Sequence, residues 1–95
     1  MPQVQSETRI KVEKATEKKL SELSIKKWPI WTKEPSVFDW SYDESETCYF
    51  LEGDVTVKTD RGEINFGRGD LVTFPKGLSC TWKVKTAVRK HYHFG

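Results

Sequence analysis

The sequence has few cysteines, no long apolar run, no internal repeat and no low-complexity tract. Its two cysteines, Cys48 and Cys80, belong to no CxxC pair, and two cysteines alone do not make a disulfide framework. No apolar run approaches the roughly 20 residues of a membrane-spanning helix, and no early apolar segment indicates a secretory signal. We therefore expect a soluble cytoplasmic protein without membrane contact. It should form one domain over residues 1–95, with residues 1–8 as a flexible tail.

Aromatic residues, by contrast, are abundant, with twelve in 95 residues. They supply large buried areas, or a lined pocket, from few positions. Charge is uneven, because residues 33–54 carry one basic and seven acidic side chains, whereas residues 71–95 carry five basic and none acidic. A basic segment with aromatic residues could bind nucleic acid. However, Lys83 and Lys85 alternate with apolar residues, as on the wet face of a half-buried strand, so we expect no nucleic-acid partner.

Alternating residues and turn signals predict a mostly β chain. The segment "TRIKVEKA" predicts a short edge strand, and "TEKKLSELSI" predicts a short helix with Thr16 as its N-cap. Pro29 ends this region, because it restricts Trp28 to extended conformations. Short strands separated by Gly and Pro turns indicate a sandwich or a barrel. The remaining strands are expected at 37–42, 47–52, 54–59, 63–66, 71–74, 79–84 and 88–94.

Two motifs resemble those of a known family. The segment "GDLVTFPKG", residues 69–77, has the spacing of the second signature of the cupins, and "ETCYFLEG", residues 46–53, resembles the end of their first signature. With a closing "KHYHF", residues 90–94, the chain is similar to small single-domain cupins related to the cupin domain of ureidoglycine aminohydrolases. The resemblance covers residues 28–94. It implies an all-β cupin double-stranded β-helix, a jelly-roll barrel, with one short N-terminal helix here, and typically a homodimer.

The resemblance also locates the metal site of metal-binding cupins, where two histidines, a glutamate and a further histidine meet at one ion. The corresponding residues here are Trp40, Tyr42, Glu46 and Cys80. Indole offers no metal donor, and one carboxylate with one thiol falls short of the usual three or more ligands. We therefore expect no metal and no cofactor.

A rebuilt zinc site stays open as an alternative, because Glu46, Cys48 and Cys80 share the expected interior and a histidine could complete them. His91 and His93 are one residue apart and share a face of the last predicted strand. The favoured interpretation is that the two cysteines are small buried apolar groups, and a disulfide or redox pair is a further alternative.

Glu46 is the candidate catalytic residue. A carboxylate that faces an aromatic interior needs a partner, since burying it alone is costly. Tyr42 is the nearest candidate donor and Lys90 a candidate charge partner. Glu46 could be held in a structural hydrogen bond or ion pair, or it could anchor a ligand or transfer a proton.

Three functions follow from these observations. The favoured one is binding of a small organic molecule in the barrel, where aromatic rings stack on the ligand and Glu46 fixes its polar end. The alternatives are a hydrolase or isomerase of a small metabolite, by analogy with ureidoglycine aminohydrolase, and a non-catalytic dimeric interaction module. A homodimer would cover the exposed "RIKVEK" edge strand. The expected pocket residues are Trp40, Tyr42, Glu46, Cys48, Cys80 and Trp82.

Overall fold

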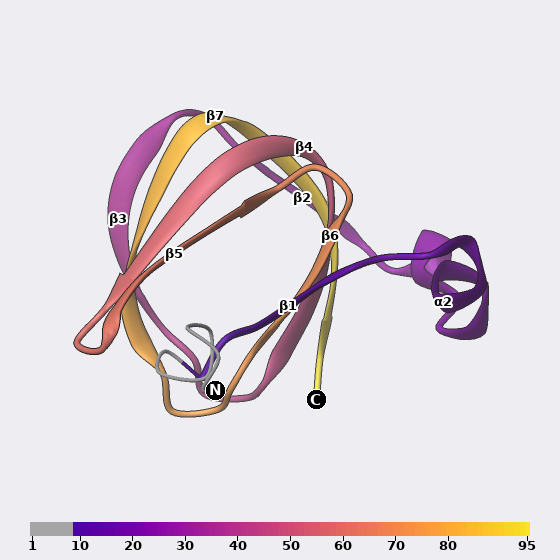
Figure 1. Cartoon of the computed structure of the whole chain (residues 1–95), viewed down its shortest axis with the longest axis horizontal. Helices are drawn as coiled ribbons and strands as arrows, with labels where there is room; N and C mark the ends of the chain where they lie inside the picture. The colour runs from indigo at the N-terminus through magenta and orange to yellow at the C-terminus, as the bar shows by residue number, and fades with distance from the viewer. Residues whose placement is uncertain (1–8) are drawn as a thin grey trace, which may run out of the picture.

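The computed structural model describes residues 9–95, which form a barrel of antiparallel strands with a small helical segment at its side (Figure 1). The predicted tail, residues 1–8, lies outside the described residues. The elements are β1 (Lys11–Lys14), α2 (Glu17–Glu22), the 3-10 helix η1 (Ile25–Lys27), β2 (Ile30–Lys33), β3 (Ser36–Ser41), β4 (Glu46–Thr59), β5 (Gly62–Gly67), β6 (Asp70–Phe74) and β7 (Ser79–Phe94).

The N-terminal elements agree with the sequence. Strand β1 pairs with β6 at one end of the strand order, so the predicted edge strand is confirmed. Helix α2 begins after Thr16, whose hydroxyl accepts a hydrogen bond from the Lys19 N–H at 3.1 Å, as predicted for its N-cap. Ser24 at a φ of 54° then turns the chain into η1. No helix within residues 9–95 is long and apolar enough to span a membrane.

Strands β4 and β7 are longer than expected. The sequence places a break at Gly53 and another after residue 84, and both predictions are wrong, because each strand continues through the break. The two halves of these strands have different partners. The first half of β4 pairs with β6 and the second half with β5, while β7 pairs first with β3 and then with β2. Strand β2 was not predicted as a strand.

Gly53 bends β4 at the point where its partner changes. Its φ is 123°, and a Cβ atom there would lie 2.7 Å from Cγ2 of Val88. The pairing register between β4 and β7 shifts around this residue. Before the bend the buried residues of β4 occupy even positions, such as Phe50, and after it they include Val55 and Val57 at odd positions. A bulge that inserts a residue produces such a change of face.

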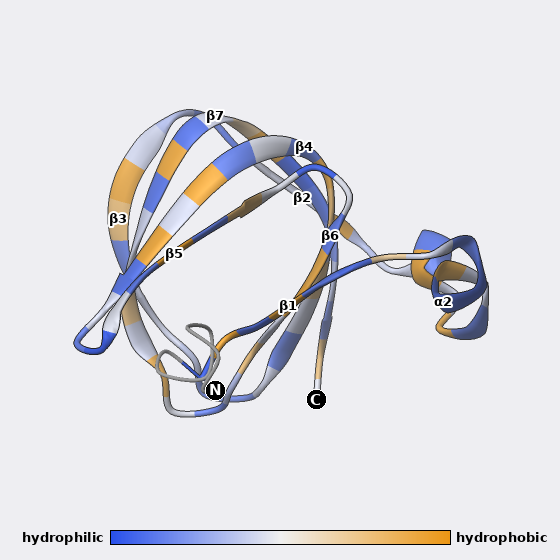
Figure 2. Cartoon of the chain, in the orientation of Figure 1, coloured by the Kyte–Doolittle hydropathy of each residue, from blue (hydrophilic) through white to orange (hydrophobic). Residues whose placement is uncertain are grey.

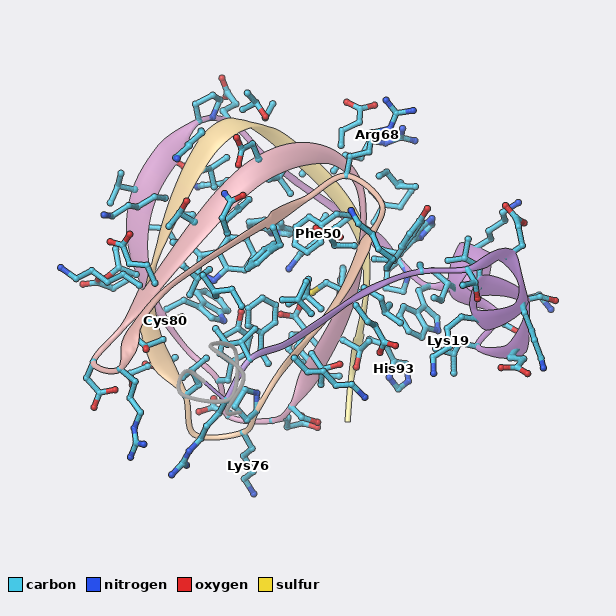
Figure 3. All side chains as sticks on the ribbon, viewed as in Figure 1. Lys19, Phe50, Arg68, Lys76, Cys80 and His93 are labelled. Carbon is cyan, nitrogen blue, oxygen red and sulfur yellow. The ribbon has the colours of Figure 1, made fainter. Side chains whose placement is uncertain are left out.

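The core lies inside the barrel. Hydrophobic and hydrophilic residues alternate along the second half of β4 and along β7, which is the pattern of strands with one buried face (Figure 2). Phe50 points into the barrel, whereas Arg68 and Lys76 lie on its outside (Figure 3). Four ring pairs fill the centre, with centroid distances of 5.0 Å for Phe50–Phe66, 5.8 Å for Phe66–Phe74, 5.6 Å for Phe74–Trp82 and 4.9 Å for Tyr42–Phe74. Close packing of such rings stabilises the fold beyond the area that they bury.

Candidate binding cavity

The barrel contains a cavity of about 200 Å³ that opens to solvent. Seven of the nine residues that line it are aromatic, and the other two carry opposite charges. The lining residues are Trp31, Phe38, Trp40, Tyr42, Glu46, Trp82, Lys90, Tyr92 and Phe94. An apolar cavity with a few polar groups is the usual form of a small-molecule site.

The cavity has an exposed end and a buried end. Trp40 is 49% exposed and Phe94 45%, so these two rings flank the opening. The buried end is formed by four lining residues that are no more than 5% exposed, Tyr42, Glu46, Trp82 and Lys90. The charged pair therefore lies at the inner end, away from solvent.

Strand register brings these residues together. In the β3–β7 pair Phe38 lies opposite Trp82, and in the β2–β7 pair Trp31 lies opposite Lys90. Trp82 and Lys90 are an even number of residues apart on β7 and so point to the same side of that strand. Strand β4 pairs with the other edge of β7 and contributes Glu46 to the interior.

Lys90 and Glu46 form a buried ion pair. Nζ of Lys90 lies 3.5 Å from Oε2 of Glu46 and donates a hydrogen bond to Sγ of Cys48 at 3.1 Å. The exposed fraction is 5% for the lysine side chain and 7% for the glutamate side chain. Lys90 is thus the charge partner expected for Glu46. The alternative partner is not used, because no hydrogen bond within residues 9–95 joins Tyr42 to Glu46.

Aromatic rings surround the Lys90 ammonium group. Nζ lies 4.8 Å from the ring centroids of both Trp31 and Trp82, and 5.8 Å from that of Phe50. Each such contact contributes about 0.5–2 kcal/mol, with the larger values for desolvated cations. The rings and the carboxylate together replace the hydration that Lys90 loses on burial.

The Tyr42 hydroxyl is held in its neutral form. Burial raises the pKa of Tyr42 well above its ordinary value, and the negative charge of Glu46 raises it further. The nearby Trp82 N–H lowers the pKa in part, although Nε1 is buried and forms no hydrogen bond of standard geometry among residues 9–95. Tyr42 can therefore offer the cavity an O–H group but no anion near neutral pH.

Both cysteines are free and buried, so the alternative of a disulfide is wrong and the interpretation as small buried groups is confirmed. Burial raises the pKa of the Cys48 thiol to about 12, although the charge of Lys90 lowers it in part. Burial also raises the pKa of Cys80 to about 11, and the Trp82 N–H opposes that rise. A neutral buried thiol is a poor nucleophile.

The structure brings together four of the six expected pocket residues, because Trp40, Tyr42, Glu46 and Trp82 line the cavity. Cys48 lies behind the cavity wall, where its thiol contacts Lys90. Cys80 lines a separate surface depression that it shares with Trp40. The six residues therefore do not form one cluster.

These residues do not fit a metal ion. In the part of the chain that the structure describes, no group of three or more His, Cys, Asp or Glu residues is arranged to hold one. The place between the Glu46 carboxylate and the Cys48 thiol is taken by the Lys90 ammonium group, which is itself a cation. His91 Nδ1 lies 2.9 Å from the carbonyl oxygen of Trp28, and the His93 ring packs on the Trp28 ring at 5.2 Å. Odd positions of β7 face away from Lys90, so neither histidine can complete the rebuilt zinc site.

Sequence reasoning missed several lining residues, namely Trp31, Phe38, Tyr92 and Phe94, and it considered Lys90 only as a charge partner. The signal for Lys90 was present in the alternation that begins at Trp82. The alternation can be extended from Trp82 to Lys90 only if residues 79–94 are known to form one continuous strand. The predicted break after residue 84 concealed it.

The antiparallel barrel and its interior cavity define a cupin-type protein. The chain belongs to the EutQ-like cupin domain family, which it matches over residues 20–92. This confirms the predicted cupin double-stranded β-helix with one short helix.

Solved structures agree with this assignment. A DUF861 family protein from Thermotoga maritima is 59% identical, with a TM-score of 0.89 over 92% of this chain and 100% of that one. The EutQ protein of Clostridium difficile is 19% identical, with a TM-score of 0.64 over 90% of this chain and 66% of that one. An RmlC-like cupin from Shewanella frigidimarina is 15% identical, with a TM-score of 0.53 over 68% and 64% of the two chains. The last two show the fold alone. No curated protein matches the chain.

Proposed function

We propose that the protein binds a small organic molecule in the barrel cavity and that the Lys90–Glu46 pair stands where other cupins hold a metal ion. The observation that carries this proposal is the composition of the cavity, whose walls are seven aromatic rings and whose inner end is one buried ion pair. Aromatic rings bind apolar or planar groups, and a few buried polar groups fix a ligand's orientation.

The intrinsic fluorescence of the protein can test this proposal. Three of the four tryptophans, Trp31, Trp40 and Trp82, line the cavity. A ligand that enters the cavity should therefore change the tryptophan emission. Titration with single-ring aromatic compounds should give saturable changes, and ligand-observed NMR should detect the same compounds as bound.

A variant at the opening identifies the binding place. Trp40→Ala widens the opening and should weaken binding of these compounds by about tenfold, because it removes a ring that covers the ligand. Val37→Ala is the matched control, since Val37 lies on the same strand, is 69% exposed and does not line the cavity. The proposal fails if no compound binds at millimolar concentration, or if both variants bind as the unchanged protein does.

The alternative of a hydrolase or isomerase similar to ureidoglycine aminohydrolase has less support. Glu46 lines the cavity and is the candidate proton acceptor, but one of its oxygens is already paired with Lys90. Activation of water by a metal would need ligands that this cavity does not assemble. Turnover of a candidate metabolite that is abolished in Glu46→Gln would favour the enzyme.

We also propose a homodimer formed through β1. Among residues 9–95 this strand pairs only with β6, so one of its edges is left without a partner strand. Unpaired edges favour the addition of another strand, and a two-fold axis would pair β1 with its own copy. We further propose that the protein is located in the cytoplasm.

A further inference from the structure

We propose that the ligand is a neutral, planar, single-ring molecule that carries an N–H group next to a carbonyl, as lactams and pyridones do. This inference rests on the proposed binding function and names the chemical class that the cavity would select.

The size of the cavity limits the ligand to one ring. An engineered cavity of about 150 Å³ in another protein takes up benzene, so a space of that order holds a single six-membered ring. The present cavity, at about 200 Å³, leaves room for a few substituent atoms beyond one ring. A fused two-ring ligand would have to extend past Trp40 into solvent.

The walls favour a flat ligand. The Phe38 and Trp82 rings are stacked at 5.9 Å with an angle of 19° between their planes, and the Trp31 ring stands across them at 76° to Trp82. All three rings line the cavity. A planar ring can stack on a face and meet an edge at once, which is the preferred geometry of aromatic groups.

The inner end offers a donor and an acceptor side by side. Lys90 has three N–H donors, and the structure assigns hydrogen bonds to Oε2 of Glu46 and Sγ of Cys48. Within residues 9–95 no standard hydrogen bond reaches Oε1 of Glu46. A ligand carbonyl can therefore accept from Lys90 while the neighbouring ligand N–H donates to Glu46. A lactam edge satisfies both groups, whereas a hydrocarbon satisfies neither.

The ion pair at the inner end of the cavity disfavours charged ligands. Lys90 and Glu46 are the two charged residues in the lining and cancel each other, while Tyr42 contributes a neutral hydroxyl. An anionic ligand would be repelled by Glu46 and a cationic one by Lys90. Either would place an uncompensated charge among aromatic rings, which is costly. A neutral dipolar edge avoids that cost.

Four compounds of nearly equal size test the inference: 2-pyridone, toluene, benzoate and benzylammonium. We expect 2-pyridone to bind about tenfold more tightly than toluene, and both ions to bind more weakly than toluene, by calorimetry and tryptophan fluorescence. If toluene binds and 2-pyridone binds no better, the cavity still takes up small molecules and only the ligand class is overturned. If none of the four binds, the proposed function fails with it.

A double variant assigns the selectivity to the ion pair. Glu46→Leu combined with Lys90→Met removes the acceptor and the donor together, and the ratio of 2-pyridone affinity to toluene affinity should fall to about one. The exposed pair Glu63 and Lys83 provides the control, since Glu63→Leu with Lys83→Met should leave that ratio unchanged. A ratio that stays near ten in the first double variant would overturn the assignment to Lys90 and Glu46. Saturable toluene binding reports that the cavity is intact in each variant.

Discussion

Replacing Lys90 with methionine removes one partner of the buried ion pair while keeping most of the apolar stem of the side chain. The Glu46 carboxylate, with 7% of its side chain exposed, is then left without its cation among aromatic rings. Breaking a buried pair in this way costs about 3–5 kcal/mol, mainly because the remaining charge stays desolvated. Loss of the ring contacts to Trp31 and Trp82 adds to this cost.

The expected loss is large for a domain of this size. The free energy of unfolding of such domains is about 5–15 kcal/mol. A loss of 3 kcal/mol, at about 4–8 °C per kcal/mol, should lower Tm by about 12–24 °C. Urea unfolding at neutral pH measures the free energy directly, and calorimetry measures Tm.

A double-mutant cycle separates the ion pair from the packing. Glu46→Leu alone should also destabilise, because it leaves the Lys90 ammonium buried. The double variant, Glu46→Leu with Lys90→Met, should lie close to the unchanged protein, since apolar groups of similar size can replace a buried pair at little cost. Lys83→Met is the control and should cost less than about 1 kcal/mol, because its pair with Glu63 is exposed. Equal losses in Lys90→Met and Lys83→Met would refute the reasoning, as would a double variant that loses the sum of both single changes.

Three further predictions concern other parts of the molecule. Cys48 and Cys80 should resist thiol reagents near neutral pH. Their raised pKa values, about 12 and 11, exceed those of unfolded thiols, so the free energy of unfolding should fall as pH rises above about 9. Urea unfolding that is unchanged up to about pH 11 would contradict this. Gly53→Ala should destabilise by more than Gly62→Ala, since both have positive φ but only at Gly53 would the Cβ atom meet Val88; equal urea midpoints would show that the contact is unimportant. Light scattering should give the mass of a dimer, and a monomer at all working concentrations would rule out pairing through β1.

The sequence was sufficient for the class of fold and for the faces of individual strands. Strand alternation, together with the resemblance to cupins, placed Glu46, Cys48 and Cys80 in the interior, and all three are buried. Trp82 was expected to line the pocket, and it does. These predictions succeeded because the period of a strand is two residues and holds wherever one face is buried.

The sequence was not sufficient for the cavity. Which rings meet depends on the pairing of β2 and β3 with β7, and local patterns do not encode the register between distant strands. Glycines also misled the prediction, since Gly53 looks like a turn residue although it bends a continuous strand. The sequence predicts that Cys48, Cys80 and Glu46 share the interior. That the Lys90 ammonium group lies beside Cys48 depends on how β4 pairs with β7, and only the structure shows it.

The position of β7 in the barrel has a consequence for how the protein is made. This strand follows the other strands of the barrel in the sequence, and it pairs with β4 along one edge and with β2 and β3 along the other. When the chain has been synthesised as far as residue 78, strands β2, β3 and β4 therefore exist but β7, the strand with which all three pair, does not. Those strands present open edges and unburied aromatic rings until the final sixteen residues of the barrel emerge. Closure of the barrel therefore waits until β7 has been made, and termination of synthesis before β7 should yield a chain that chaperones retain or proteases remove.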